Sequence, residues 1–283
     1  METVAIVGVG LIGSSFGLAL KKAGFTGRIL GVSSPGAVRQ ALACGAIDEA
    51  WPLEEAVRRA DVVFLSQPIR RILETLGALD EWLRPGSLVT DAGSTKAQIV
   101  ARGRQVIRRG QFLGGHPMAG KEKRGASEAD ADLFAGRTWV LTPADPAELE
   151  TAIAREFLGW IRAIGAAPVC LSPEEHDRVV AFTSHLPQVL STALAATLAA
   201  QLPAPEQLQV AGPGLADMTR LAASPYEVWE DILTTNAGAI QNALGAYISR
   251  LADLRANLGG ARAGQEFRIA NQFAERLKRQ SRG

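Results

Sequence analysis

Cysteine is scarce in this chain. Only Cys44 and Cys170 occur among its 283 residues, far apart and without a Cys-x-x-Cys pair. We therefore expect neither a disulfide framework nor a metal site. Free cysteines fit a reducing compartment, so the sequence predicts a cytoplasmic protein.

An excess of charge of one sign is also missing. The chain has 30 basic and 29 acidic residues, and its formal net charge is +1. Basic residues gather at 121–124 and 276–282, but no aromatic residue that could stack on a base is interleaved with them. We therefore expect no nucleic-acid partner.

Long hydrophobic runs are lacking as well. The longest weakly polar run, residues 189–202, is too short and too rich in hydroxyls to cross a bilayer. No basic stretch precedes the first apolar residues, so no secretory signal is expected. These patterns predict a soluble protein with no membrane partner.

The first 172 residues alternate between short β-rich runs and helical stretches, a pattern typical of an α/β fold with a parallel sheet. The predicted strands are residues 4–7, 28–32, 62–65, 88–90, 111–113, 139–141 and 168–171. After Ser172 and Pro173 no further strand pattern occurs. We therefore predict a Rossmann-type domain over residues 1–172 and an all-α domain over residues 173–283, divided by Gly and Pro into roughly four helical pieces.

Residues 240–258 carry one continuous apolar stripe at helical spacing. Its members are Ile240, Leu244, Ile248, Leu251, Leu254 and Leu258. The stripe is interpreted first as packing inside the helical domain, the usual fate of such a pattern. The alternative is a subunit interface, which predicts a homodimer formed through the helical domain.

A glycine motif follows the first predicted strand and opens a helix. It runs Gly8-Val9-Gly10-Leu11-Ile12-Gly13. Gly8 permits a tight turn, Gly10 lets the backbone approach a pyrophosphate, and Gly13 allows the helix to pack closely on the strand. The first amides of the helix, at Leu11 and Ile12, favour phosphate binding. The motif predicts a bound dinucleotide.

The second predicted strand ends without the acidic residue that usually binds the adenosine ribose of NAD. Ser33 and Ser34 stand there instead, with Arg39 a turn later. Hydroxyl donors and an arginine suit a 2′-phosphate, so the sequence favours NADP over NAD. Arg39 pointing into solvent is the alternative. After the strand at 62–65, Gln67 and Pro68 form an expected wall beside the nicotinamide.

Candidate catalytic residues follow two later strands, at the sheet edge where ligands bind in this fold class. Thr95 and Gln98 have capping-box spacing, which would leave the hydroxyl of Ser94 free for a site. His116 stands among glycines and a proline, with no apolar face to cover it. An imidazole is the natural base for an alcohol whose carbon loses hydride.

With these motifs in order, the chain resembles the prephenate/arogenate dehydrogenase family over nearly its whole length. The blocks are the Gly8 to Gly13 motif, Gly93-Ser94-Thr95-Lys96, Gly114-Gly115-His116-Pro117-Met118-Ala119-Gly120, Ser172-Pro173-Glu174-Glu175-His176-Asp177, Ser184-His185-Leu186-Pro187, and Asp217-Met218-Thr219-Arg220 followed by Trp229. The missing acid after the second strand departs from the pattern of NAD-using relatives.

The resemblance implies roles for individual residues. His116 would be the catalytic base and Ser94 would help to orient it, while Arg220 would bind a substrate carboxylate. His185 would line the same pocket, and we place Ser184 there with it. Glu122 either gates the mouth of the pocket or is an exposed loop charge.

Structural alternatives stay open for three of these segments. Arg220 could pair with an acidic neighbour at the surface, and His185 could be a hydrogen-bonded core histidine. For His176 a structural role is favoured, because Glu174 and Glu175 suit the first turn of a helix.

The expected reaction is oxidative decarboxylation of prephenate, a small dicarboxylate, with hydride transfer to NADP or NAD. Arogenate, its amino analogue, is the alternative substrate. A β-hydroxyacid dehydrogenase would require a lysine on an early helix of the second domain, and residues 174–258 contain none. A non-catalytic redox sensor would have no need for Ser94, His116 and Arg220 together.

Overall fold

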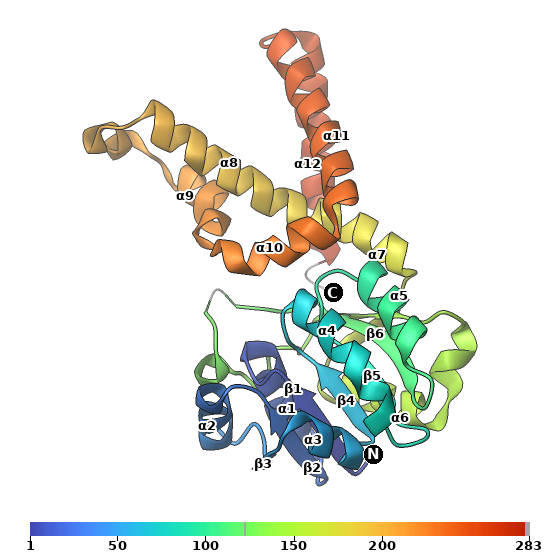
Figure 1. The fold of residues 1–283 in the computed structure, drawn as a ribbon. Helices are drawn as coiled ribbons and strands as arrows, with labels where there is room; N and C mark the ends of the chain where they lie inside the picture. Colours follow the sequence, from blue (N-terminus) through green and yellow to red (C-terminus); the bar gives the residue numbers. More distant parts are fainter. Residues whose placement is uncertain (122, 281–283) are drawn as a thin grey trace.

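The computed structural model describes residues 1–121 and 123–280, and its first half is built on a single sheet (Figure 1). In the described residues the strand order is β3-β2-β1-β4-β5-β6-β7-β8. The strands are β1 Thr3–Val7, β2 Arg28–Val32, β3 Glu49–Ala50, β4 Val62–Leu65, β5 Leu88–Asp91, β6 Gln111–Pro117, β7 Thr138–Thr142 and β8 Ala167–Cys170. The predicted α/β class and the Rossmann-type arrangement are confirmed.

The sheet departs from the expected parallel arrangement at one pair. β6 and β7 run antiparallel, while β7 and β8 are parallel to each other. β6 also extends to Pro117, four residues beyond the predicted end at residue 113. The glycines at 114 and 115 suggested a loop, but the backbone of β7 pairs with this segment and keeps it extended. His116 therefore stands in a strand.

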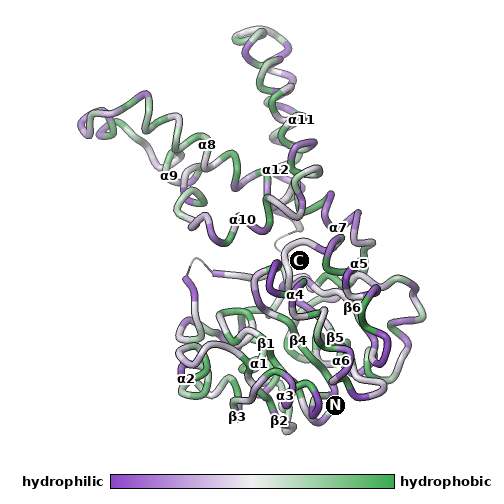
Figure 2. The backbone as a smooth tube through the Cα atoms, in the orientation of Figure 1, coloured by the Kyte–Doolittle hydropathy of each residue, from purple (hydrophilic) through white to green (hydrophobic). Residues whose placement is uncertain are grey.

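Helices cover both faces of the sheet. They are α1 Leu11–Lys22, α2 Pro35–Ala43, α3 Leu53–Arg59, α4 Ile69–Leu79, α5 Ala97–Val106 and α6 Ala152–Ala163. One face buries an aromatic cluster in which Phe16 contacts Phe64 and Trp139 at ring-centroid distances of 4.5 and 5.6 Å. The other face packs α4 and α5 against strands that are hydrophobic along their length (Figure 2). Two-sided burial explains why these strands are continuous apolar runs.

The second half is helical, as predicted. Its elements are α7 Pro173–Val180, a π-helical segment Ala181–His185, α8 Leu186–Gln201, α9 Pro213–Thr219, α10 Tyr226–Thr235, α11 Ala237–Ala256 and α12 Ala261–Gln280, with short 3-10 turns at Pro205–Val210 and Arg220–Ala223. The helices form two arms that diverge from the sheet domain, α8 to α10 in one and α11 with α12 in the other (Figure 1).

The apolar stripe of α11 is only partly internal. Ile240 is 6% exposed, whereas Ile248, Leu251 and Leu258 are 55%, 48% and 78% exposed. Packing inside the helical domain, the favoured interpretation of the stripe, is therefore wrong for its outer half. α12 runs beside that half, with Arg250 paired to Glu266, but leaves these apolar side chains exposed.

One helical run, Pro173–Gln201, is long and apolar enough to cross a membrane by length and composition. The sequence expectation considered only residues 189–202 and so missed the continuation through α7. Core helices of globular proteins pass the same test. This run also carries His176, Asp177 and His185, which form polar contacts with other parts of the chain.

Candidate active site

The turn between β1 and α1 has the geometry that a dinucleotide requires. Gly8 has a φ of +98°, which favours glycine. A Cβ on Gly13 would lie 2.3 Å from the carbonyl oxygen of Gly8, so only glycine lets the helix approach the turn. A Cβ on Gly10 would meet nothing within 4 Å, so the space beside it is open. Gly10 offers no side-chain cap, and the first amides of α1 are available to a phosphate.

A pocket opens beside this turn. It is lined by Gly8, Gly10, Val32, Ser33, Ser34, Ala37, Ser66, Gln67, Pro68 and Arg71. The predicted cofactor residues Ser33, Ser34, Gln67 and Pro68 thus lie together. Leu11 and Ile12 follow at the start of α1. The pocket fits a nicotinamide dinucleotide, because its amides and open glycine backbone are the groups that a pyrophosphate requires.

The cation in this pocket differs from the one proposed from the sequence. Arg39 is exposed and does not line the pocket, whereas Arg71, in the first turn of α4, does. Arg71 also pairs with Glu74 at 2.7 Å. Its position three residues after Pro68 was the available signal, because one helical turn returns a side chain to the pocket side.

His116 contacts a second histidine from the helical domain. Its Nδ1 lies 2.8 Å from Nε2 of His176, and Nδ1 of His176 lies 2.8 Å from Oδ1 of Asp177. A carboxylate can only accept, so a neutral His176 donates its Nδ1 proton to Asp177 and accepts at Nε2. His116 then donates from Nδ1, and its own Nε2 carries the lone pair. The relay leaves a proton acceptor at Nε2 of His116.

The surroundings keep His116 neutral. Desolvation of the largely buried ring lowers its pKa well below the usual 6.5, and nearby His176, Lys96 and His185 lower it further. A positive charge on any of these neighbours would repel a positive charge on His116. His116 is therefore an unprotonated base at neutral pH.

Asp177 binds three groups at once. Besides His176, its carboxylate accepts from the backbone amides of Lys96 and Ala97 at 2.7 and 2.9 Å. These amides open α5, so Asp177 caps that helix from the other domain. The capping box predicted for Thr95 and Gln98 is wrong.

Thr95 points away from the helix that it was expected to cap. Its hydroxyl lies 2.8 Å from that of Thr235, at the end of α10. Because Thr95 belongs to the sheet domain and Thr235 to the helical domain, this contact joins the two halves of the chain beside the site.

His185 is buried and belongs to the same network. The side-chain amide of Asn236 lies 3.3 Å from Nδ1 of His185 and donates to the carbonyl of Asp177 at 2.8 Å. The ring of Trp229 packs edge-on at 6.0 Å. Burial lowers the pKa of His185 to about 4, so its ring is neutral. The ring is hydrogen-bonded, and it lies close enough to His116 that a positive charge on it would lower the pKa of His116.

For the other predicted site residues, the structure gives only their place in the fold and their exposure. Ser94 is half-buried in the loop between β5 and α5, two residues before Lys96, and Ser184 is half-buried in the π-helical segment. Arg220 is exposed at the start of the turn Arg220–Ala223. Glu122 lies outside the described residues. The roles of these four residues stay predictions.

His176 was assigned a structural role from the sequence, yet it contacts His116 directly. Its helix does begin as expected, with Ser172 accepting from the amide of Glu175 at 3.1 Å and with acids in the first turn. The contact itself joins residues 60 positions apart, and no local pattern reports such a pairing. Asp177 was missed for the same reason.

Two family models match the chain. The prephenate dehydrogenase nucleotide-binding domain matches residues 16–175, and the prephenate dehydrogenase dimerization domain matches residues 172–277. The chain belongs to the prephenate dehydrogenase family. The family resemblance seen in the sequence motifs is thereby confirmed.

Individual members of the prephenate dehydrogenase family agree with this assignment. The prephenate dehydrogenase of Lactococcus lactis is 36% identical over 242 residues, which are 83% of this chain and 65% of that enzyme, so the chain spans about two thirds of its length. The structure of the Aquifex aeolicus enzyme with hydroxyphenyl propionate and NAD+ is 32% identical, with a TM-score of 0.85 over 100% of this chain and 99% of the other. Synechocystis arogenate dehydrogenase is 29% identical, with a TM-score of 0.81 over 98% and 99%.

Proposed function

We propose that this chain is a dehydrogenase that oxidises and decarboxylates prephenate on the route to tyrosine. The observation that supports this best is the pair of contacts that joins Nδ1 of His116 to His176 and His176 to Asp177. These contacts leave the lone pair of His116 at Nε2. A base of this kind can take the proton of the ring hydroxyl. A nicotinamide dinucleotide held at the turn from Gly8 to Gly13 would supply the hydride acceptor for the carbon that bears this hydroxyl.

The remaining bonds rearrange within the substrate. As the hydroxyl oxygen forms a carbonyl, the C–C bond to the ring carboxylate breaks and carbon dioxide leaves. The electron pair of that bond completes an aromatic ring and leaves the oxygen as a phenolate, which takes a proton back from His116. Until then His116 holds the released proton, which gives an imidazolium that Asp177 stabilises through His176. The guanidinium of Arg220 is proposed to bind a substrate carboxylate. Ser94 is proposed to orient the ring hydroxyl of the substrate.

The direct test measures cofactor reduction at 340 nm with four pairings, prephenate or arogenate with NADP or NAD. We expect turnover with prephenate. Arogenate is the second candidate, because the Synechocystis arogenate dehydrogenase shares the fold over nearly the whole chain. Absence of turnover in all four pairings contradicts the proposal.

We further propose that NADP is the preferred cofactor. Ser33, Ser34 and Arg71 line the cofactor pocket, and no acidic residue is among the described residues that line it. A guanidinium and two hydroxyls suit a 2′-phosphate. Arg71→Ala should raise the KM for NADP by roughly tenfold or more and leave that for NAD unchanged, since one charge-assisted hydrogen bond contributes about 1.5–3 kcal/mol. Arg39→Ala is the control, and equal effects on both cofactors would contradict the preference.

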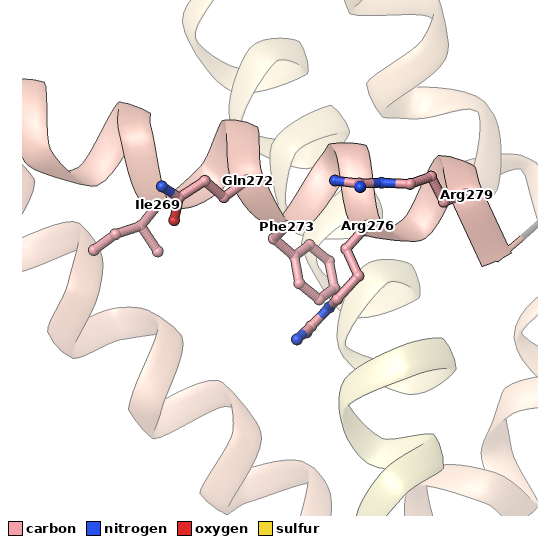
Figure 3. Close-up of a pocket in the computed structure, with 5 residues that line it drawn as sticks. All are labelled: Ile269, Gln272, Phe273, Arg276 and Arg279. Carbon is pink, nitrogen blue, oxygen red and sulfur yellow. The ribbon is translucent and has the colours of Figure 1, made fainter.

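A homodimer formed through the helical domain is the proposed assembly. The matching family model is described as a dimerization domain. Large apolar side chains are exposed on α12 as well as on α11, among them Phe267, Ile269, Phe273 and Leu277. Figure 3 shows Ile269 and Phe273 on α12, with the Arg276 guanidinium 5.3 Å from the Phe273 ring. A second copy of the chain is the natural cover for these surfaces.

A further inference from the structure

A buried ion pair lies directly behind His116. The side chains of Asp91, at the end of β5, and Lys96, just before α5, are both completely buried and in contact. Removing two charges from water is costly, and such pairs are weak stabilisers of a fold. Neither residue has a part in the proton transfer described above. The pair therefore requires an explanation other than stability alone.

Both members of the pair bind the backbone of Gly115. Lys96 Nζ donates to its carbonyl at 2.6 Å, and its amide donates to Asp91 Oδ1 at 3.1 Å. The second carboxylate oxygen of Asp91 accepts from the amide of Gly93 at 2.8 Å. A Cβ on Gly115 would lie 2.7 Å from the carbonyl oxygen of Asp91, so the segment fits closely.

These bonds replace a missing part of the sheet. The pairing of β5 with β6 ends at Thr90 and Leu113. Beyond that point β7 is the one strand neighbour that β6 has among the described residues. The side chains of Asp91 and Lys96 supply hydrogen bonds on the open side, at the residue that precedes His116.

Lys96 also closes a ring of contacts around the base. Its backbone amide donates to Asp177, the carboxylate that orients His176. The ring thus runs from His116 through His176 and Asp177 to Lys96, and back through Gly115. Both ends of the relay are attached to the same lysine. The Lys96 ammonium is also one of the charges that lower the pKa of His116.

We propose that Asp91 and Lys96 are positioning residues that fix the backbone of His116 through their hydrogen bonds to Gly115. The inference rests on the proposed role of His116 as the base. Because a misplacement of about 1 Å at a reacting group costs roughly a hundredfold in rate, loss of this pair should appear in kcat.

The test uses Lys96→Met and the double variant Asp91→Asn/Lys96→Met. The double variant leaves no unpaired buried charge, so it is expected to fold even if the single variant does not. Both should lower kcat at least tenfold and change the KM values less than threefold. In Lys96→Met the acid limb of kcat/KM should move to higher pH, because a cation near His116 is gone. A fold-only role predicts a lower melting temperature with unchanged kcat and pH profile, which would overturn the proposal.

Histidine NMR makes the test independent of turnover. The chain has three histidines, His116, His176 and His185, so each ring can be assigned by single substitution. The midpoint of His116 should rise in Lys96→Met and stay unchanged in Lys21→Met, which breaks the pair of Lys21 with Asp48 on the surface. An unmoved His116 midpoint in Lys96→Met contradicts the proposal, whether or not the wild-type protein turns over prephenate.

Discussion

A single nitrogen atom decides the chemistry at the residue scale. Nε2 of His116 is an acceptor because its partner nitrogen, Nδ1, is already used in the contact with His176. The tautomer is set two residues away, by the carboxylate of Asp177. Such an arrangement prepares the base before the substrate arrives, so none of the substrate's binding energy is needed to organise it.

Substituting the base should remove the chemical step and little else. We expect His116→Asn to lower kcat by two to four orders of magnitude, roughly the contribution of a general base. The cofactor affinity should change little, because His116 does not line the pocket beside Gly8. Steady-state kinetics and a cofactor titration measure both quantities. A variant with kcat within tenfold of the wild type would show that another group takes the proton.

The pH dependence should carry the mark of a depressed pKa. Because the pKa of His116 lies well below 6.5, kcat/KM should stay flat from pH 8 down to 6.5 and fall only at lower pH, as the imidazole becomes protonated. The profile of the free enzyme is measured under limiting substrate. An acid limb centred at or above 6.5 would be inconsistent with a desolvated base.

Part of the candidate site was evident in the sequence, and part was not. His116 and the cofactor glycines follow strands, where the fold class places ligands, so local pattern sufficed. The contacts of His116 with His176, and of Asp177 with the amides of α5, depend on how the two domains dock. The predicted end of the strand at residue 113 was wrong, because the backbone of Gly114 and Gly115 pairs with β7 and continues the strand.

At the element scale the turn from β1 to α1 combines two demands on glycine. Gly13 is required by the protein itself, since its Cβ would collide with the backbone of Gly8. Gly10 is required by a ligand alone, because a Cβ there meets open space. The helix and the strand set the first requirement, and the phosphate sets the second.

The two glycines should therefore respond differently to alanine. Gly13→Ala should destabilise the fold by about 1–3 kcal/mol, the usual cost of overpacking, and lower the melting temperature. Gly10→Ala should melt as the wild type does and bind the cofactor about tenfold more weakly, a loss of about 1.4 kcal/mol. Thermal denaturation and calorimetric titration separate these effects. A lower melting temperature for Gly10→Ala would mean that the space beside Gly10 is not open.

Predicting the elements succeeded where periodicity was strong. Strands β1, β2, β4, β5, β7 and β8 begin and end within a residue of the expected positions. The two-residue β3 was missed, because two residues carry no period. The apolar stripe of α11 was predicted from the sequence. Periodicity predicts that such a face is buried, but it does not predict whether the same chain or a second subunit buries it.

At the scale of the whole molecule, the exposed apolar faces of α11 and α12 predict an assembly. Leu251→Glu should convert a dimer of about twice 29.9 kDa to a monomer, because a carboxylate cannot be buried unpaired in an apolar interface. Light scattering at micromolar concentration measures the mass. Arg39→Ala, on the far domain, is the matched control. A wild-type mass of a single chain would contradict the dimer.

Polar contacts cross the boundary between the two domains. Thr95 meets Thr235, and the backbone amide of Arg70 donates to Asp231 at 3.0 Å. The histidine relay crosses the same boundary. The base and the groups that orient it therefore come from different domains.

This division between two domains constrains how the sequence of the protein can change in evolution. A chimera with the sheet domain of one relative and the helices of another would take its base from the first parent and the orienting carboxylate from the second. Substitutions that shift α7 by an ångström would have to be matched by changes around β6. The two halves can diverge freely at their outer surfaces, but across the histidine pair they must evolve as one unit.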